Sequence, residues 1–361
     1  MRLGHLVVAL ILTLGACAGV YLATREGKEP AGEKDSSALL PYGDIRSVTF
    51  YLFPFDEARC CEALNDSIPA IRKAGFNTIW IVNPWVSYDP QPLTTPRVFE
   101  ESRFEHLRQV LGLLRENDMK AILGLNYLGK GWSPEGIEPG SWVADPRMYE
   151  AFESYVEEFL QRIEDFNDTT YILFFTEGTE PEGIDAYADA ERHASILRET
   201  LGSLPSRLDP TLRGKFSIGY HDYSIVNLGW GNGASPTPLP TPYDFVSMVF
   251  YGFEDASDEE IRSEFDVRIG RFRATFPNSP LIVGEMGASL CQHGEENQAR
   301  VILAKVSHAL DCGLGFNLWH WRPIPGEDDC QNAAFMGLAI TREDNTTKPV
   351  VDRLGVLLRR T

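Results

Sequence analysis

Two glutamates in this sequence each stand at the end of a short apolar run. Glu177 follows the run Tyr171–Thr176, and Glu285 follows the run Leu281–Gly284. A carboxylate in such a place is costly if it is buried without a partner, so each one needs either a structural ion pair or a polar cavity. If both carboxylates face one cavity, they can instead divide a reaction between a nucleophile and a general acid/base.

Short apolar runs recur along the chain, and the structure that they form must hold the two glutamates in place. They are Ser47–Phe53, Thr78–Asn83, Ala121–Asn126, Tyr171–Thr176, Phe216–Tyr220, Phe245–Tyr251, Leu281–Gly284 and Gly315–Trp319. Continuous apolar runs of this length are typical of parallel strands that are buried on both faces. We therefore predict eight strands.

Helical patterns, with apolar residues three and four positions apart, separate the runs. Helices are expected at Glu57–Ala74, from Phe104 to Leu114, from Met148 to Ile163, at Ala186–Leu201, at Ser257–Phe276, from Glu295 to His308 and at Val350–Leu358. Ser257 is a suitable N-cap for its helix. One unit departs from the pattern, because Ser224–Tyr243 contains four prolines and three glycines. The fifth helix is therefore expected to be short or replaced by a loop.

The alternation of eight strands with helices predicts the α/β class, as a single-domain (β/α)8 TIM barrel over residues 41–361. Active sites of this fold lie at the carboxyl ends of the strands. Because Glu177 follows the fourth predicted strand and Glu285 the seventh, both carboxylates would lie on that one face.

Four segments of the chain resemble a known enzyme family. Pro280–Gly287 is similar to the nucleophile strand of glycoside hydrolase family 5, a retaining family of clan A. Ala74–Trp80 resembles the start of its second strand, and Phe316–Trp319 resembles its eighth strand with the tryptophan that floors the sugar site. Met336–Pro349 resembles the tail before its last helix. The resemblance implies an enzyme that cleaves β-glycosidic bonds of a largely neutral polysaccharide by double displacement.

The resemblance also implies roles for single residues. Glu285 would be the nucleophile, Glu177 the acid/base, and Tyr251 a hydroxyl that orients the nucleophile. Glu180 is a rival acid/base, because Thr179–Pro181 echoes the family's Asn-Glu-Pro. In a retaining glycosidase the two carboxyl groups lie ~5–5.5 Å apart.

The chain departs from the family at three places. Thr176 stands where the clan usually has asparagine, Ile79–Val82 lacks the family's arginine, and no His-x-Tyr is found near Tyr251. A catalytically inactive, glycan-binding TIM barrel is therefore the alternative to an enzyme.

Aromatic side chains gather in the loops that should surround the site. Sugar rings pack their C–H faces on such flat apolar surfaces, although core packing explains part of the set. Besides Glu180, the residues expected to bind substrate are Trp85, Asn126, Tyr251, Trp319 and Trp321.

Composition and missing motifs exclude other chemistries. The chain has 33 basic and 52 acidic residues and a formal net charge of −19, which disfavours nucleic acid as a partner. It contains no His-Glu-x-x-His, Gly-x-Ser-x-Gly or Walker sequence. The adjacent pair His221-Asp222 is weak evidence for a metal site, so neither a cofactor nor a metal is expected.

The first residues predict export. An apolar run extends from Leu6 to Ala23, and Leu14–Cys17 resembles a bacterial lipoprotein signal in which Cys17 becomes lipidated. An uncleaved N-terminal anchor and a cleaved secretory peptide are the alternatives. Thr24–Leu40 has the composition of a flexible tether. We expect a protein held at the periplasmic or cell surface through this lipid or anchor, or otherwise secreted.

Export permits disulfides. Cys291 and Cys330 would lie in the loops after the seventh and eighth strands, which are neighbours in a barrel, so they could form a bridge at the rim of the site. Buried, unpaired thiols are an equally good interpretation.

Overall fold

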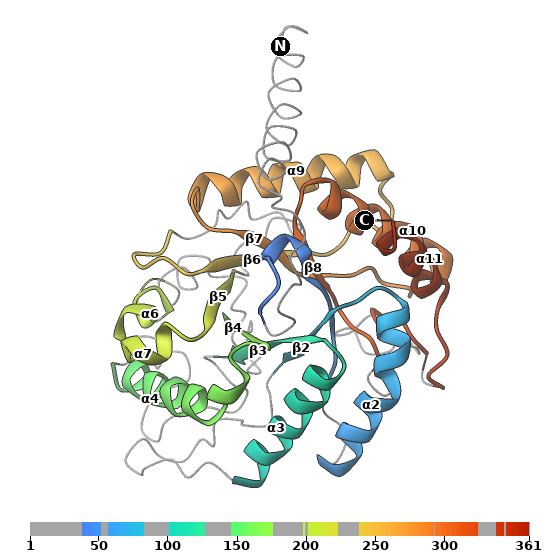
Figure 1. Ribbon diagram of the computed structural model, residues 1–361. Coiled ribbons are helices and arrows are strands. Elements are labelled where there is room, and N and C mark those ends of the chain that lie inside the picture. Colours follow the sequence, from blue (N-terminus) through green and yellow to red (C-terminus); the bar gives the residue numbers. More distant parts are fainter. Residues whose placement is uncertain are drawn as a thin grey trace, which may run out of the picture.

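Eight parallel strands close into a barrel, because β1 pairs with β8 as well as with β2. The strands are β1 (Arg46–Thr49), β2 (Thr78–Val82), β3 (Lys120–Asn126), β4 (Thr170–Phe175), β5 (Ser217–Asp222), β6 (Phe245–Phe250), β7 (Leu281–Met286) and β8 (Gly315–Leu318). The computed structural model describes residues 38–51, 57–82, 101–126, 146–175, 198, 201–222, 238–291, 293–323, 337–342 and 344–360. The predicted single-domain (β/α)8 TIM barrel is confirmed (Figure 1).

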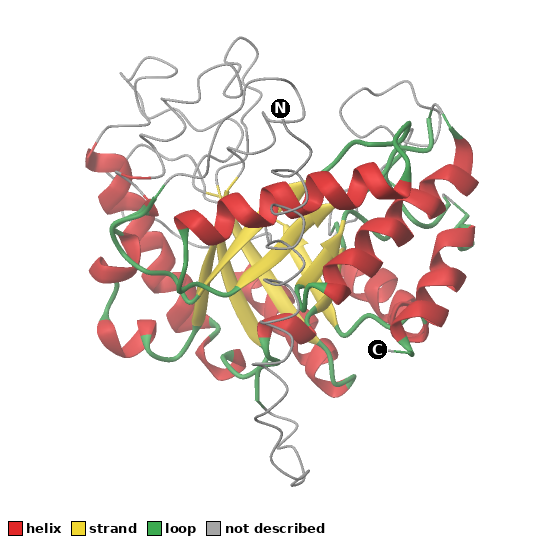
Figure 2. Cartoon of the chain, turned by 90° about the horizontal axis from the view of Figure 1, so that it is seen from above, coloured by secondary structure: helices red, strands yellow, loops and turns green. Residues whose placement is uncertain are grey.

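Helices surround the strands, as Figure 2 shows. They are η1 (Tyr42–Asp44), α2 (Glu57–Lys73), α3 (Glu101–Glu116), α4 (Pro146–Arg162), η3 (Glu164–Phe166), α6 (Leu204–Arg207), α7 (Pro210–Arg213), α9 (Asp258–Thr275), α10 (Gly294–Asp311) and α11 (Pro349–Leu358). Ser257 caps α9 as predicted, in a capping box with Glu260. The short helices α6 and α7 were not predicted. Of the helix predicted at Ala186–Leu201, only Arg198 and Leu201 are described, and most of Ser224–Tyr243 also lies outside the described residues.

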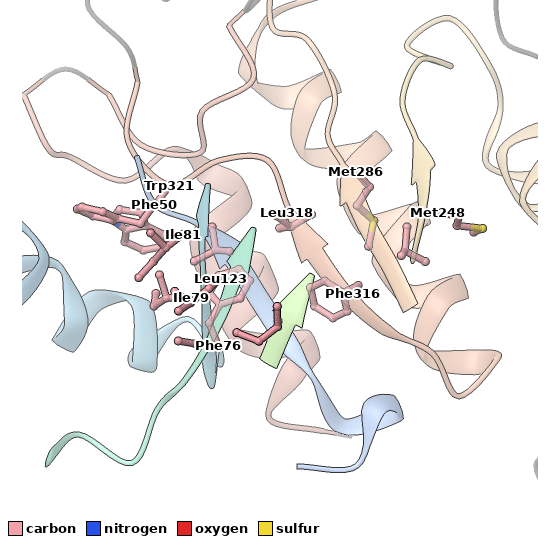
Figure 3. Packing of buried hydrophobic residues seen from close by; sticks show 14 of the residues in the cluster. Phe50, Phe76, Ile79, Ile81, Leu123, Met248, Met286, Phe316, Leu318 and Trp321 are labelled. Atoms are coloured by element: carbon pink, nitrogen blue, oxygen red, sulfur yellow. The ribbon is translucent and has the colours of Figure 1, made fainter. Parts of the chain in front are cut away.

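The core divides into two clusters that the strands separate. In a strand, alternate side chains point to opposite faces. On β2, Trp80 belongs to the lumen cluster, whose buried members come from the strands and the residues next to them, with none from the described α-helices. Its neighbours Ile79 and Ile81 belong to the outer cluster, which fills the layer between strands and helices (Figure 3).

Residues before β1 seal the amino-terminal end of the lumen. The Tyr42 ring packs on Tyr171 and Phe245, and its hydroxyl lies 2.8 Å from the Ser217 hydroxyl. Leu39, at the end of the predicted tether, also packs against the lumen cluster. The opposite, carboxyl end of the lumen is the end at which the fold positions a site. Within the described ranges, no helix combines the length and the apolarity that crossing a membrane requires.

Candidate active site

Glu285 lies inside β7, although the sequence predicted that the strand would end at Gly284. It is 4% exposed, so it belongs to the wall of the barrel and not to a loop above it. On β6, Met248 pairs with Val283 while the next residue, Val249, pairs with Glu285. One extra residue, Gly284, is therefore inserted into β7, which is the arrangement of a β-bulge.

The bulge decides where Glu285 points. Ile282 belongs to the lumen cluster, and Val283 and Met286 belong to the outer cluster. Strict alternation from Ile282 would send Glu285 outward, into the apolar layer beneath the helices. With Gly284 inserted, Glu285 instead shares the lumen side with Ile282, and its carboxylate reaches His221.

His221 on β5 is the described partner of the Glu285 carboxylate. Its Nε2 lies 3.4 Å from Glu285 Oε1, and its Nδ1 lies 2.6 Å from the Ser247 hydroxyl on β6. His221 and Ser247 are both fully buried. The edge of the Trp80 ring packs against the imidazole with centroids 5.4 Å apart, which fixes the plane of His221. Three polar side chains from adjacent strands therefore form a row, in which His221 lies between Ser247 and Glu285.

Gly284 is required for this chain to form. A Cβ atom at this position would lie 1.7 Å from Ser247 Oγ and 2.8 Å from His221 Nδ1. The Asn317 side chain on β8 holds the bulge from the other side, donating to Gly284 O at 2.9 Å and to Thr49 Oγ1 at 2.8 Å. The glycine therefore provides both the extra residue of the bulge and the space for the histidine–serine pair.

Two predicted site residues lie at this end of the lumen. Tyr251 directly follows β6 and packs, partly buried, against the lumen cluster. Its ring lies close to Gly287, two residues beyond Glu285. Trp319 directly follows β8, is 9% exposed, and packs edge-on to Trp80 in the lumen cluster. The peptide bond from Trp319 to His320 is cis.

Trp321 lies elsewhere, contrary to its predicted place in the site. It is 3% exposed and belongs to the outer cluster, where its ring meets Phe76 at a centroid distance of 6.2 Å. Two residues beyond Trp319, it returns to the outer side of the barrel, where it borders a cavity of about 380 Å³ beside α2. Tyr220 on β5 also packs in the outer layer, on Tyr243 and Phe276.

Other predicted residues lie outside the described part of the chain. These are Trp85, Glu177, Glu180, Cys17 and Cys330, together with the side chain of Asn126, the last residue of β3. The choice between Glu177 and Glu180 therefore stays open. Cys61 and Cys312 carry reduced thiols, and Cys291 is not among the free thiols, but its pairing with Cys330 remains a prediction.

Lys305 of α10 supports the site from behind. Its ammonium group is fully buried in the outer layer and donates to the carbonyl oxygens of Gly252 at 2.8 Å and Gly287 at 2.7 Å, with Phe250 O at 3.4 Å. These acceptors flank Tyr251 and follow Glu285, so one side chain ties together the ends of β6 and β7. Burial lowers the pKa of Lys305 to about 7; the negative charge of Glu254 opposes this shift, and the positive charge of Arg268 adds to it.

His221 and Ser247 are the site residues that sequence reasoning missed. The predicted fifth strand ended at Tyr220, which left His221 in a loop as a weak candidate metal ligand; the observed β5 continues to Asp222. A signal was present, because His221 and Ser247 each occupy a lumen-facing position by the alternation of their own strands. A polar residue at such a position needs a partner inside the barrel.

No protein-family model matches the chain, and no curated protein sequence matches it. Among solved structures, an exo-β-1,4-mannosidase from Opitutaceae bacterium strain TAV5 matches with a TM-score of 0.65 and 16% identity. That match covers 91% of this chain and 62% of the mannosidase, so the chain spans less than two thirds of that protein's length.

Two further structures match over most of both chains. A family 5, subfamily 18 glycoside hydrolase from Streptomyces cattleya, solved in complex with Manβ1-4GlcNAc, has a TM-score of 0.67 and 14% identity, covering 88% of this chain and 80% of that one. An endocellulase from Pyrococcus horikoshii, solved with cellotetraose, has a TM-score of 0.58 and 14% identity, covering 86% and 92%. At these identities the likeness is one of fold, and the fold is that of the family 5 barrels which the sequence motifs resemble.

Proposed function

We propose that this chain is a retaining glycoside hydrolase that cleaves β-linked, largely neutral oligo- or polysaccharides. The observation that carries the proposal is the bulge at Gly284, which aims the buried Glu285 into the lumen and against His221. A carboxylate placed this deeply in a barrel wall is costly unless it has partners, so the arrangement indicates selection for that carboxylate at that position.

His221 acts as a positioning residue for the nucleophile. If the Ser247 hydroxyl donates to Nδ1, the neutral imidazole carries its proton on Nε2, on the side of Glu285. With Nε2 3.4 Å from Glu285 Oε1, that proton faces the carboxylate and helps to hold its orientation. The buried Ser247 thus selects the tautomer that the reaction needs.

The reaction has two steps. A Glu285 oxygen attacks the anomeric carbon to form a glycosyl ester, while the glycosidic C–O bond breaks and the leaving oxygen takes a proton from the acid/base. The acid/base residue, now deprotonated, then removes a proton from a water molecule. The water oxygen attacks the anomeric carbon, and the ester bond to Glu285 breaks. We assign the acid/base role to Glu177, with Glu180 as the rival.

The structural neighbours and the site aromatics support a proposal for the substrate class. The neighbours include a β-1,4-mannosidase and an endocellulase, and Trp319 with Tyr251 offers aromatic surface beside the carboxylate. We therefore propose β-mannans and β-glucans as the first polymers to test. Asn126 and Trp85 are further proposed contacts to the sugar; Trp321 is not proposed.

The deciding experiment measures whether the protein hydrolyses oligosaccharides and which anomer it releases first. Incubation with manno- and cello-oligosaccharides, followed by NMR of the newly released reducing end, should show the β-anomer first, because two inversions restore the configuration. Glu259→Gln, on the exposed face of α9, is the matched control and should behave as wild type. Initial release of the α-anomer would contradict the retaining mechanism.

A glycan-binding barrel without catalysis is the second candidate. Trp80 favours it, since this fully buried ring occupies the lumen on β2, the strand on which the family carries an arginine. Binding of these oligosaccharides by calorimetry without any product over days would support this candidate over the enzyme.

We further propose export, with Cys17 as the lipidated residue and Cys291–Cys330 as a disulfide. The N-terminal run and Leu14–Cys17 support the first, and the absence of Cys291 from the free thiols supports the second. A Cys17→Ser variant should lose lipid labelling in a bacterial host. Alkylation of the denatured, unreduced protein should leave Cys291 and Cys330 unlabelled, whereas labelling of both would contradict the bridge.

A further inference from the structure

Three side chains that can ligate a metal meet in the interface between α9 and α10. Asp266 comes from α9, His308 from the last turn of α10, and Cys312 from the C-cap of α10. His308 Nε2 lies 2.8 Å from Asp266 Oδ1 and 3.9 Å from Cys312 Sγ, and the three ligand atoms all lie within 4.8 Å of one another. The two helices cover the outside of the barrel, so this cluster is separate from the Glu285 site (Figure 1).

An ion pair alone accounts for only part of this geometry. A single atom, His308 Nε2, faces both the carboxylate and the sulfur. It carries at most one hydrogen, and at 2.8 Å that hydrogen is directed at Asp266. The hydrogen cannot bond strongly to the sulfur at the same time, whereas a cation in its place would attract all three ligand atoms.

The spacing suits a tetrahedral cation. Bonds of about 2.0–2.3 Å at tetrahedral angles place neighbouring ligand atoms about 3.3–3.6 Å apart. The observed 2.8 Å and 3.9 Å bracket that range, so small side-chain rotations would reach it. His308 and Cys312 are four residues apart, which puts both on one face of a helix end. The edge of the Phe265 ring packs on the His308 imidazole and orients it.

We propose that Asp266, His308 and Cys312 form a binding site for a zinc-class divalent cation. A thiolate, an imidazole and a carboxylate together select a borderline-soft metal over magnesium or calcium, which prefer all-oxygen sites. The Cys312 thiol is 7% exposed, whereas the Asp266 side chain is 35% exposed, so water can reach the fourth position from the carboxylate side. The bound cation would cross-link α9 to α10.

Cobalt(II) tests the site by a readout that needs no enzyme activity. Titration of the reduced full-length protein should give the visible bands of tetrahedral cobalt and a near-ultraviolet thiolate-to-cobalt charge-transfer band, and excess zinc should abolish both. Cys312→Ser should lose the charge-transfer band. His308→Gln should weaken cobalt binding at least tenfold, because one of three ligands is lost. Loss of a mere outer-shell partner already lowers metal affinity about 10–100-fold.

The chain offers a matched control at the other end of α10. His293 Nε2 lies 3.2 Å from Asp255 Oδ1, a histidine–carboxylate pair outside the proposed cluster, so His293→Gln should bind cobalt as wild type does. As a second measurement, zinc should raise the Tm of wild type but not of Cys312→Ser. A wild-type spectrum without thiolate charge transfer, or a charge-transfer band that persists in Cys312→Ser, would overturn the proposal.

Discussion

The two ends of the barrel lumen are built from the same strands but have opposite chemistry. At the amino-terminal end, Tyr42, Tyr171 and Phe245 pack their rings together and close the lumen with apolar surface. At the carboxyl end, His221 and Glu285 occupy lumen positions on the same sheet. The difference is that packed rings close the floor, whereas the mouth holds a buried carboxylate and imidazole that face each other.

Each end depends on one glycine. A Cβ at Gly315 would lie 2.0 Å from the Tyr42 carbonyl oxygen, so this glycine lets the floor segment approach β8. A Cβ at Gly284 would lie 1.7 Å from Ser247 Oγ, so that glycine lets a polar pair form. A substitution at Gly315 should therefore affect stability alone, whereas one at Gly284 should affect stability and activity together.

The largest expected effect comes from removing the carboxylates. Glu285→Ala should lose at least about a thousandfold in kcat, because no glycosyl ester can form whatever the leaving group. Glu177→Ala should keep activity on nitrophenyl glycosides, whose leaving group departs without a proton, and added azide should restore its turnover by attacking the intermediate. Azide rescue of Glu180→Ala in place of Glu177→Ala would reassign the acid/base.

The next effect tests the bulge at the mouth. Gly284→Ala should cost about 1–3 kcal/mol of unfolding free energy through overpacking. It should also reduce kcat roughly a hundredfold, as misplacement of a reacting group by about 1 Å does. Ser247→Ala removes the nearest clashing atom, so the double variant should recover part of the lost stability, measured by urea unfolding. Additive destabilisation in this cycle would show that the clash lies elsewhere.

The fold was predictable because it rests on local pattern. Strands such as β2 and β4 are nearly continuous apolar runs, and the helices follow regular spacing, with Ser257 and Glu260 marking the start of α9 as their types require. Glu285 could be nominated as a site residue because its motif and its position after an apolar run are visible in the sequence, and its catalytic role stays a prediction.

The placement of side chains around Glu285 was less predictable, because it depends on register between strands that are far apart in sequence. The bulge shifts β7 against β6, and nothing in Leu281–Met286 alone reveals a residue inserted at Gly284. His221 meets Ser247 only because β5 and β6 pair in one register. Trp321 was misassigned for a related reason: proximity in sequence to Trp319 does not fix which side of the barrel wall a side chain faces.

A smaller effect is expected at the positioning histidine. His221→Gln should lower kcat by about 10–100-fold, the range typical when a group that orients a reacting residue is lost. KM should change little, because the fully buried His221 exposes no surface to a sugar. His106→Gln, on α3, is the control and should leave both constants unchanged. A rise in KM with unchanged kcat would indicate that His221 binds the sugar instead.

The last prediction concerns the pH dependence of stability, and no effect on catalysis is expected from it. The pKa of Lys305 is lowered by burial to about 7, against an ordinary value of 10.5. Between these values the unfolded chain binds a proton at Lys305 that the folded chain does not, so this residue makes stability rise with pH from about 7 to 10.5, by at most about 1.4 kcal/mol per pH unit. Below pH 7 both states are charged and the contribution is constant.

Lys305→Met should be less stable than wild type at every pH, because three carbonyl oxygens lose their donor, but it should lack this rise. Urea unfolding at pH 6, 7.5 and 9 gives the slope directly, and Lys215→Met, which removes a surface ion pair with Glu164, should keep the slope of wild type. Equal slopes in Lys305→Met and wild type would show that Lys305 stays charged throughout, held as an ammonium by its three acceptors. In that case Lys305 would still link the ends of β6 and β7, but it would contribute nothing to the pH dependence of the unfolding free energy.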